Sequence, residues 1–354
     1  MLMLLVERGL EIDDGLIMSC FTSQTIMSNN EIANLLFEHI KDVNYHDIDG
    51  DSFLMRACMA GNISLASKLL QKGADRDRAR PAYGDYLYAA CVYGYAEVVK
   101  LLLSWDMQGV RIPSESLKRA LKSAAYDKHI DIVRLLVVYG IASESLNHAL
   151  YWSAQRNQMN VTEYLLDNGT DVNASVRYYR TALSSACTQG SLSLVQLLLS
   201  RGADPNLTDG RGESPLEAAL LYPEIVKSLL EAGADPNQLF ASGSSALLEL
   251  ASSYHNRSLC LLRIVLLPYG ADPNLAHTIT GVTPLMIAAQ AQCVGLVKLL
   301  LEHGADVTQV NSEGKSVLDI LGQRRDDRYD EVIELCTSYI DSNKPFFGAK
   351  QVLK

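Results

Sequence analysis

The chain has 354 residues, of which 48% are hydrophobic and 20% are charged, and its formal net charge is −10. This negative balance argues against nonspecific binding to nucleic acid, because counterion release from phosphates needs a concentrated basic surface. No stretch is long and apolar enough to span a bilayer, and Glu7 interrupts the apolar start of the chain too early for a secretory signal. We therefore expect neither membrane insertion nor export.

The seven cysteines are scattered and form no Cys-x-x-Cys motif. An odd number without paired spacing is typical of proteins in a reducing compartment. Charge is also uneven: residues 76–134 hold ten basic and seven acidic side chains, so the acidity lies elsewhere. We expect an intracellular, cytoplasmic protein in which any basic contact surface is confined to that middle segment.

A glycine that follows a leucine-rich segment recurs along the whole chain. Gly9, Gly73 and Gly140 are separated by 64 and 67 residues, each close to two periods of about 33. The glycines at positions 140, 169, 202, 233, 270 and 304 are then separated by 29, 33, 31, 37 and 34 residues. This spacing predicts a stack of about ten units of roughly 33 residues, with small insertions in the loops.

Each unit is predicted to contain two helices and a turn. Residues 98–103 and 132–137 carry apolar side chains at helical spacing, as a half-buried second helix does. The glycine after that helix supplies a left-handed terminating residue, and the Asp-Pro-Asn that often follows forms a turn. A shorter Ala-rich helix comes first. Ser214 or Thr283 followed by proline is a typical N-terminal cap for it.

One unit carries the pattern almost in full: Thr283-Pro284-Leu285, Ala288-Ala289, the run at 296–301 and Gly304-Ala305-Asp306. This unit resembles an ankyrin repeat, and the resemblance extends over most of residues 1–341. It implies an all-α solenoid of about ten helix–turn–helix repeats joined by short hairpin loops. We expect a single domain over residues 1–341, with a partial first repeat and a polar capping repeat at the end. Residues 342–354 are expected to form a C-terminal tail.

The repeats on the N-terminal side depart from this pattern. Ser52, Asp85 and Thr181 begin the tripeptides that stand where the family usually has Thr-Pro-Leu. The units at residues 117–140 and 146–169 keep both helices but lose most of the cap. The sequence therefore predicts the repeat architecture in this part of the chain, but not the geometry of its turns.

No motif of catalysis or cofactor binding stands out. The chain has no GxxxxGK[ST], GxGxxG or GxSxG segment, and its histidines show no metal-ligand spacing. Cys58, Cys91 and Cys187 occupy equivalent sites in Ala-rich helices, which favours small buried hydrophobes over nucleophiles. We expect no cofactor, no metal and no enzymatic activity. An enzyme would need a site of dispersed residues such as Asp127, His148 and Arg156.

Aromatic residues concentrate in the irregular middle, where 11 of the 17 tyrosines lie between Tyr83 and Tyr179, together with both tryptophans. Tyr86 and Tyr164 fall at core positions of their helices. The resemblance implies that partners bind a concave face of hairpin tips and first helices, where aromatic and arginine side chains make good anchors. Matching the repeats gives the candidate partner-binding residues Tyr93, Lys118, Tyr126, Asp127, Gln155, Arg156, Arg177, Tyr178, Arg180 and Gln189.

The leading functional hypothesis is an interaction scaffold or adaptor, a monomer that binds another protein or a peptide, with no nucleic acid as partner. Degenerate repeats without an accessory domain also resemble ankyrin effectors that intracellular pathogens deliver into host cells, which is the first alternative. An enzyme with dispersed concave-face residues is the second. An equal alternative for the candidate residues is that they are ordinary surface positions of irregular repeats.

Overall fold

The computed structural model of the chain describes residues 12–23, 26, 29–75, 85–106, 112–175, 180–252, 265–322 and 329–342. Regular secondary structure in these ranges is helical, apart from an isolated antiparallel bridge between His46 and Ser52. The predicted all-α repeat fold is confirmed. Within these ranges no helix combines the length and the apolar character needed to cross a membrane. The partial repeat expected at residues 1–9 and the tail after residue 342 lie outside the described residues.

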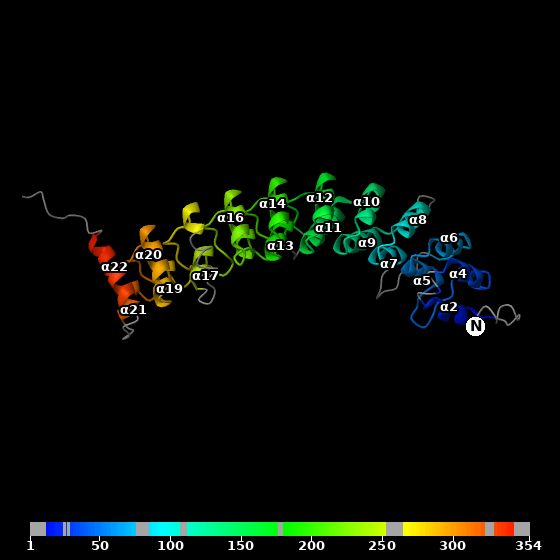
Figure 1. Ribbon diagram of the computed structural model, residues 1–354, viewed down its shortest axis with the longest axis horizontal. Helices are drawn as coiled ribbons and strands as arrows, with labels where there is room; N and C mark the ends of the chain where they lie inside the picture. Colours follow the sequence, from blue (N-terminus) through cyan, green and yellow to red (C-terminus); the bar gives the residue numbers. More distant parts are fainter. Residues whose placement is uncertain are drawn as a thin grey trace, which may run out of the picture. The chain divides into compact units, whose positions relative to one another are not determined.

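Unit 1, residues 1–171, is one of two compact units and is a stack of helix pairs. Its pairs are α2 (Asp14–Phe21) and α4 (Asn30–Phe37), α5 (Phe53–Ala60) and α6 (Ile63–Gln71), α7 (Tyr86–Val92) and α8 (Ala96–Asp106), α9 (Ser114–Tyr126) and α10 (Ile130–Tyr139), and α11 (Ser143–Gln155) and α12 (Met159–Asp167). The first helix of each pair packs on the first helix of the next, and second helices pack likewise (Figure 1). The row containing α5, α7, α9 and α11 is the first-helix layer.

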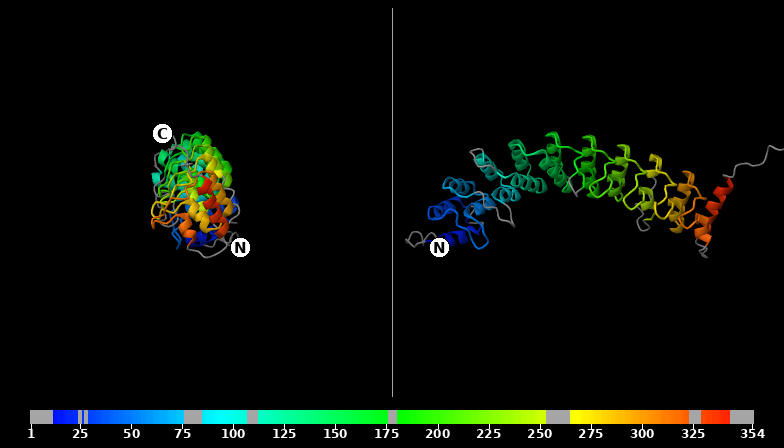
Figure 2. Two further views of the ribbon diagram at one scale, coloured as in Figure 1. Left: turned by 90° about the vertical axis from the view of Figure 1, so that its left-hand side faces the viewer. Right: turned by 180° about the vertical axis from the view of Figure 1, so that it is seen from behind.

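Unit 2, residues 172–354, repeats this plan. Its helices are α13 (Ala182–Thr188) and α14 (Leu192–Ser200), α15 (Pro215–Ala218) and α16 (Pro223–Glu231), α17 (Ala246–Ser252) and the 3-10 helix η1 (Leu267–Tyr269), α19 (Pro284–Gln290) and α20 (Val294–Glu302), and α21 (Val317–Gly322) and α22 (Asp330–Ser342). First helices again pack together, as α13 does with α15, and so do second helices, as α14 does with α16. Figure 2 shows the two rows of this unit from behind.

Leucines of the second helices and small residues of the first helices build the core of each unit. Leu136 of α10 and Leu198 of α14 are fully buried. Cys58, Cys91 and Cys187 are also fully buried in first helices, and burial raises the pKa of all three thiols far above the usual range. Thiols held neutral in this way are core residues, as their recurrence at the repeat period predicted.

The recurring glycine ends the second helices as predicted. Gly202 has a φ angle of +86°, a left-handed conformation that glycine adopts without steric cost. The Gly202 and Ala203 amides then donate hydrogen bonds at 3.0 Å to the carbonyls of Leu199 and Leu198. These bonds satisfy carbonyl groups that the end of the helix would otherwise leave free.

Most first helices begin at a side-chain cap, even where the Thr-Pro-Leu pattern is lost. Ser52 Oγ accepts a hydrogen bond from the Met55 amide at 3.2 Å, and Asp85 Oδ1 accepts one from the Tyr88 amide at 2.8 Å. Thr181 caps α13 in the same way. Serine, aspartate and threonine all supply the oxygen that the first turn needs, so these departures leave the start of the helix unchanged.

Helices α9 and α11 begin differently. Pro113 and Ala142 precede them and offer no capping side chain. Both helices have 13 residues, whereas the described first helices of unit 2 have four to seven. Only Ile141 and Ala142 separate Gly140 from α11, so about two further turns of helix replace the hairpin there. Both helices open with Ser-Glu-Ser-Leu, which places a glutamate where the helix dipole favours negative charge.

In unit 2 an asparagine joins each of several repeats to the next. Asn206 Oδ1 accepts a hydrogen bond from the Asp235 amide at 2.7 Å, and its Nδ2 donates to the Gly233 carbonyl at 3.0 Å. The same pair of bonds recurs at three more asparagines, Asn173, Asn237 and Asn274. These turn asparagines therefore tie neighbouring repeats together, and we call the series the asparagine ladder.

Candidate protein-binding surface

A hollow of about 550 Å³ lies in the first-helix layer of unit 1, between α7, α9 and α11. We call it the α9 groove, and its lining residues are Tyr88, Val92, Arg119, Lys122, Ser123, Tyr126, Asp127 and Trp152. Arg119, Lys122 and Tyr126 come from one face of α9, because residues three and four apart on a helix are neighbours. The groove is therefore centred on α9, which has no side-chain cap and is longer than the first helices described in unit 2.

Three cations of this surface lie over aromatic rings. The Arg119 guanidinium carbon is 5.2 Å from the ring centroid of Tyr88, and Lys122 Nζ is 4.2 Å from that of Trp152. Arg156, in the turn after α11, lies over Tyr126 at 3.9 Å. A cation over an aromatic face is attracted by the negative electrostatic potential of the ring. Each pair joins two neighbouring first helices, so the arrangement is fixed by the stacking of the repeats.

The rings of the groove also pack against one another. Tyr126 and Trp152 meet edge to face with their centroids 5.8 Å apart, and the buried Tyr151 contacts Trp152 in the same way at 4.9 Å. Edge-to-face contact is a favoured geometry for aromatic pairs. Tyr126 and Trp152 nevertheless stay half-buried, so one side of each ring system is held rigid while the rest faces the groove.

The charges of the groove are not neutralised within the described part of the chain. There, Arg119, Lys122 and Arg156 form no ion pair with a carboxylate. The lining contains one carboxylate, Asp127, which accepts a hydrogen bond from Ser123 Oγ at 3.3 Å. Two cations of the lining, with Arg156 over Tyr126 as a third, against one carboxylate give the groove a positive character in a chain that is acidic as a whole.

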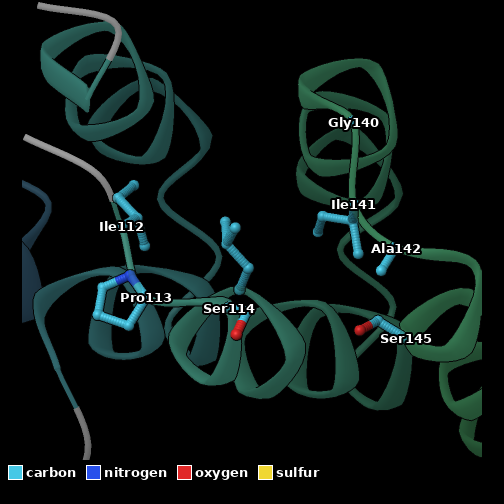
Figure 3. A pocket seen from close by; sticks show the side chains of 8 residues that line it. Ile112, Pro113, Ser114, Gly140, Ile141, Ala142 and Ser145 are labelled. Carbon is cyan, nitrogen blue, oxygen red and sulfur yellow. The ribbon is translucent and has the colours of Figure 1, made fainter. Parts of the chain in front are cut away.

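A second hollow of about 550 Å³ lies at the other end of α9. It is lined by Ile112, Pro113, Ser114, Leu117, Gly140, Ile141, Ala142 and Ser145. Figure 3 shows that its walls come from the start of α9 and from the short turn before α11. The lining is mainly apolar and occupies the place where a hairpin would stand in a regular repeat. It carries no charged side chain, so it is a less specific candidate than the α9 groove.

Comparison with known families identifies the repeat. The family described as "Ankyrin repeats (3 copies)" matches residues 23–115, 109–176 and 247–344, and the family described as "Ankyrin repeats (many copies)" matches residues 165–219. Together these matches cover more than half of the chain. The chain belongs to the ankyrin-repeat family. Ankyrin repeats form a scaffold for protein–protein interaction, and the first-helix layer is part of the face on which the resemblance places partners.

Relatives share the repeats over about half of this ankyrin chain. They include the ankyrin repeat and KH domain-containing protein mask-1 of Caenorhabditis elegans, 31% identical over 50% of this chain and 7% of the relative. Human palmitoyltransferase ZDHHC17 is 33% identical over 50% of this chain and 28% of the relative. The putative ankyrin repeat protein L371 of Acanthamoeba polyphaga mimivirus is 22% identical over 48% of this chain and 23% of the relative. The chain thus spans less than a third of each relative's length.

The structure brings part of the predicted ankyrin surface together. Tyr126 and Asp127 line the α9 groove, and Arg156 lies over Tyr126. Lys118 is half-buried on α9 and pairs with Glu144 of α11 at 3.8 Å. Gln155 is half-buried at the end of α11, one residue before Arg156. These positions share the first-helix layer, although their role in binding stays a prediction.

The remaining predicted residues lie elsewhere. Tyr93 is exposed after α7 and stacks on Tyr95 with centroids 6.2 Å apart, outside the groove lining. Arg177 and Tyr178 lie outside the described residues. In unit 2, Gln189 is exposed after α13, and Arg180 forms an ion pair with Glu213. Arg180 is thus engaged within its own unit, and its role in binding stays a prediction.

The two tyrosines assigned to the core behave differently. Tyr86 is buried, and its hydroxyl donates a hydrogen bond to the Asp75 carbonyl at 2.7 Å. Tyr164 of α12 is only half-buried, and Arg134 of α10 lies over its ring at 5.1 Å. This second pair belongs to the second helices and is a natural reference for the pairs of the groove.

Sequence reasoning missed Tyr88, Arg119, Lys122 and Trp152. The prediction took positions at the hairpins and near the ends of first helices, with Lys118 as its one position in the middle of α9. Since α9 is longer, its exposed face continues back to Arg119, three residues before Lys122. The spacing 119, 122, 126 was the available signal, because it marks one face of a helix.

Proposed function

We propose that this ankyrin-repeat chain is a scaffold that binds another protein through the α9 groove, and that it has no catalytic activity of its own. The observation that carries the proposal is a hollow at which half-buried Tyr88, Tyr126 and Trp152 are held in place by packing. Aromatic side chains that are ordered before binding lose little entropy on association. They therefore make efficient anchors for a partner.

The groove is made by three neighbouring repeats of one unit, so a monomer offers the whole surface. Its long helices enlarge the contact area that three first helices present. We place the binding event inside a cell, because the scattered cysteines of the sequence show no paired spacing, as suits a reducing compartment. An effector acting in a host cell would use the same groove and would differ only in where its partner resides.

Affinity capture with the full chain tests the proposal. The double variant Tyr126→Ala with Arg156→Ala removes an anchor ring and the cation that lies over it. We expect proteins captured by the wild-type chain from a lysate of its source cells to be lost with this variant. Quantitative mass spectrometry of the captured proteins measures the loss.

A matched variant on the second helices controls for nonspecific damage. Arg134→Ala with Tyr164→Ala removes a cation–ring pair of the same chemistry away from the groove. It should capture the same proteins as the wild type, and both double variants should keep a melting temperature within a few degrees of it. Capture that is equal for the groove variant and the control would rule out the α9 groove as the binding surface.

A further inference from the structure

Beside its rings, the α9 groove offers a partner cations, because one face of each ring already carries a cation. Arg119, Lys122 and Arg156 each cover a ring of the neighbouring helix, at 5.2, 4.2 and 3.9 Å from the ring centroids. A lysine or arginine of a partner would meet these cations before it reached a ring. The groove therefore repels a cationic ligand and attracts an anionic one.

We infer that the α9 groove takes an extended acidic segment of a partner protein, with carboxylates three residues apart. This inference rests on the proposed function and specifies the chemistry of the partner. Within the described residues the three cations have no carboxylate of their own, and Asp127 is the only acidic residue of the lining. Partner carboxylates would supply the missing counter-charges through charge-assisted hydrogen bonds.

The spacing follows from the stacking of the repeats. The cations lie at two junctions: Arg119 between α7 and α9, and Lys122 with Arg156 between α9 and α11. Packed helices have axes about 8–10 Å apart. A segment in the extended polyproline II conformation advances about 3.1 Å per residue with three residues per turn, so residues three apart lie on the same face about 9 Å apart. Two carboxylates at this separation reach one junction each.

A protein segment fits these observations better than nucleic acid does. The chain has a net charge of −10, which repels a long polyanion. Asp127 in the lining would repel a continuous row of phosphates. Bases also bind by stacking on open aromatic faces, and here Tyr88, Tyr126 and Trp152 already carry cations. A short acidic segment presents charge only where the groove has its cations.

The probes are three labelled nonapeptides built from glycine, serine and proline. The first carries glutamates at its third and sixth positions, the second at its third and fourth, and the third has glutamine in place of both. Fluorescence anisotropy with the full chain at low salt measures the Kd of each. We expect the spaced peptide to bind about tenfold more tightly than the glutamine peptide, with the adjacent isomer in between. Raising the salt should reduce the difference.

Variants locate the interaction. Lys122→Gln and Arg156→Gln should each weaken binding of the spaced peptide about tenfold, whereas Lys122→Arg should retain it. Arg134→Gln, on the second helices, should leave the Kd unchanged. Thermal unfolding confirms that each variant is folded. A spaced peptide that binds Lys122→Gln as tightly as the wild type would overturn the inference.

The remaining outcomes separate this inference from the proposed function. Equal Kd values for the spaced and glutamine peptides, or no measurable binding of either, overturn the acidic segment. Tighter binding of an eight-nucleotide oligouridylate that is lost in the same variants also overturns it, in favour of nucleic acid. If the capture experiment still depends on Tyr126 and Arg156 in those cases, the proposed function stands and the partner has another chemistry. If capture is unchanged, the proposed function itself fails.

Discussion

Two groups of repeats bury a similar core but differ in their first helices and turns. One group is α9–α12 in unit 1, and the other lies around the asparagine ladder in unit 2. Both bury the same leucine position, Leu136 in one and Leu198 in the other. The ladder repeats keep short first helices and fasten their turns to the next repeat. The α9–α12 repeats have no side-chain cap on their first helices and use 13-residue helices instead. The comparison shows that stacking depends on the core and that the turns are free to change.

The polar side chains of the two regions also differ in their partners. In unit 2, Arg180 pairs with Glu213, and the asparagines donate and accept within the stack. In the α9 groove, Lys122 and Arg156 lie over rings and have no carboxylate partner among the described residues. Polar groups already satisfied inside the protein gain little from a partner. This difference supports the proposal that the α9 groove, and not the ladder, binds a partner.

The largest expected effect tests whether the two regions share one kind of core. Leu136→Ala and Leu198→Ala each remove a fully buried side chain, so each should lower the free energy of unfolding by about 2–5 kcal/mol. Urea unfolding of the full chain, followed by circular dichroism, measures both. Similar losses support a common core. A much smaller loss for Leu136→Ala would show that the α9–α12 repeats are loosely packed.

The next effect tests the ladder. Asn237→Ala removes the hydrogen bonds to the Asp272 amide at 2.7 Å and the Gly270 carbonyl at 2.9 Å, and should cost about 1–3 kcal/mol. Hydrogen exchange should show faster exchange of the Asp272 amide. Asn160→Ala, at an exposed position of α12, should change stability by less than about 0.5 kcal/mol. Equal losses of stability for Asn237→Ala and Asn160→Ala would show that the ladder bonds do not stabilise the fold.

A smaller effect of opposite sign tests the missing cap. Ala142→Ser places a hydroxyl at the N-cap of α11, where no side-chain oxygen now accepts from the first turn. We expect a gain of about 0.5–1 kcal/mol in the free energy of unfolding. Thr283→Ala, which removes the cap of α19, should cost about 1 kcal/mol. Ser143→Ala is the control, since it lies inside the helix. A neutral Ala142→Ser would mean that the short turn prevents capping.

The smallest effect concerns pH. Burial raises the pKa of Glu217, and the neighbouring Glu213 raises it further. A pKa that is higher in the folded state means that ionised Glu217 weakens the fold, so this cost grows as pH rises from the unfolded value through the folded one. Glu217→Gln should raise stability at neutral pH by at most about 0.5 kcal/mol, since solvent screens a partly exposed charge.

The control for this effect is Glu224→Gln, at an exposed position of α16. Melting temperatures of both variants and the wild type are measured between pH 4 and pH 8. The gain of Glu217→Gln should vanish at the acidic end, where the unfolded chain is protonated as well. A gain that is independent of pH would point to packing as its cause.

Much of the fold was predictable because its signals are local. Glycine after a leucine run, as at Gly202, requires a left-handed residue, and a serine or threonine before the first helix supplies a cap. Both patterns repeat, so their spacing gave the architecture. The asparagine ladder was harder to predict. The sequence indicates only that Asn206 is a turn residue, whereas its hydrogen bonds to Gly233 and Asp235 of the next repeat appear in the structure.

The candidate surface was predictable only in part. Tyr126 and Arg156 follow from aligning the repeats, and the structure brings them into contact. Arg119 and Trp152 were missed because the absent caps of α9 and α11 indicated degraded repeats, whereas they mark longer helices. Which cation lies over which ring depends on contacts between helices about 30 residues apart, as with Lys122 and Trp152. Periodicity within one repeat does not contain that information.

The asparagine ladder also gives several neighbouring repeats of unit 2 the same joint. Removing residues 207–237 would bring Asn206 to the place of Asn237, facing the same Gly270 carbonyl and Asp272 amide. Duplicating that stretch would insert one more identical joint. Shortening or lengthening unit 2 by this stretch should therefore preserve the ladder bonds at the new seam, although its removal would take away Glu213, the partner of Arg180. The α9 groove has no such freedom, because Tyr88, Arg119 and Trp152 each depend on one particular neighbour.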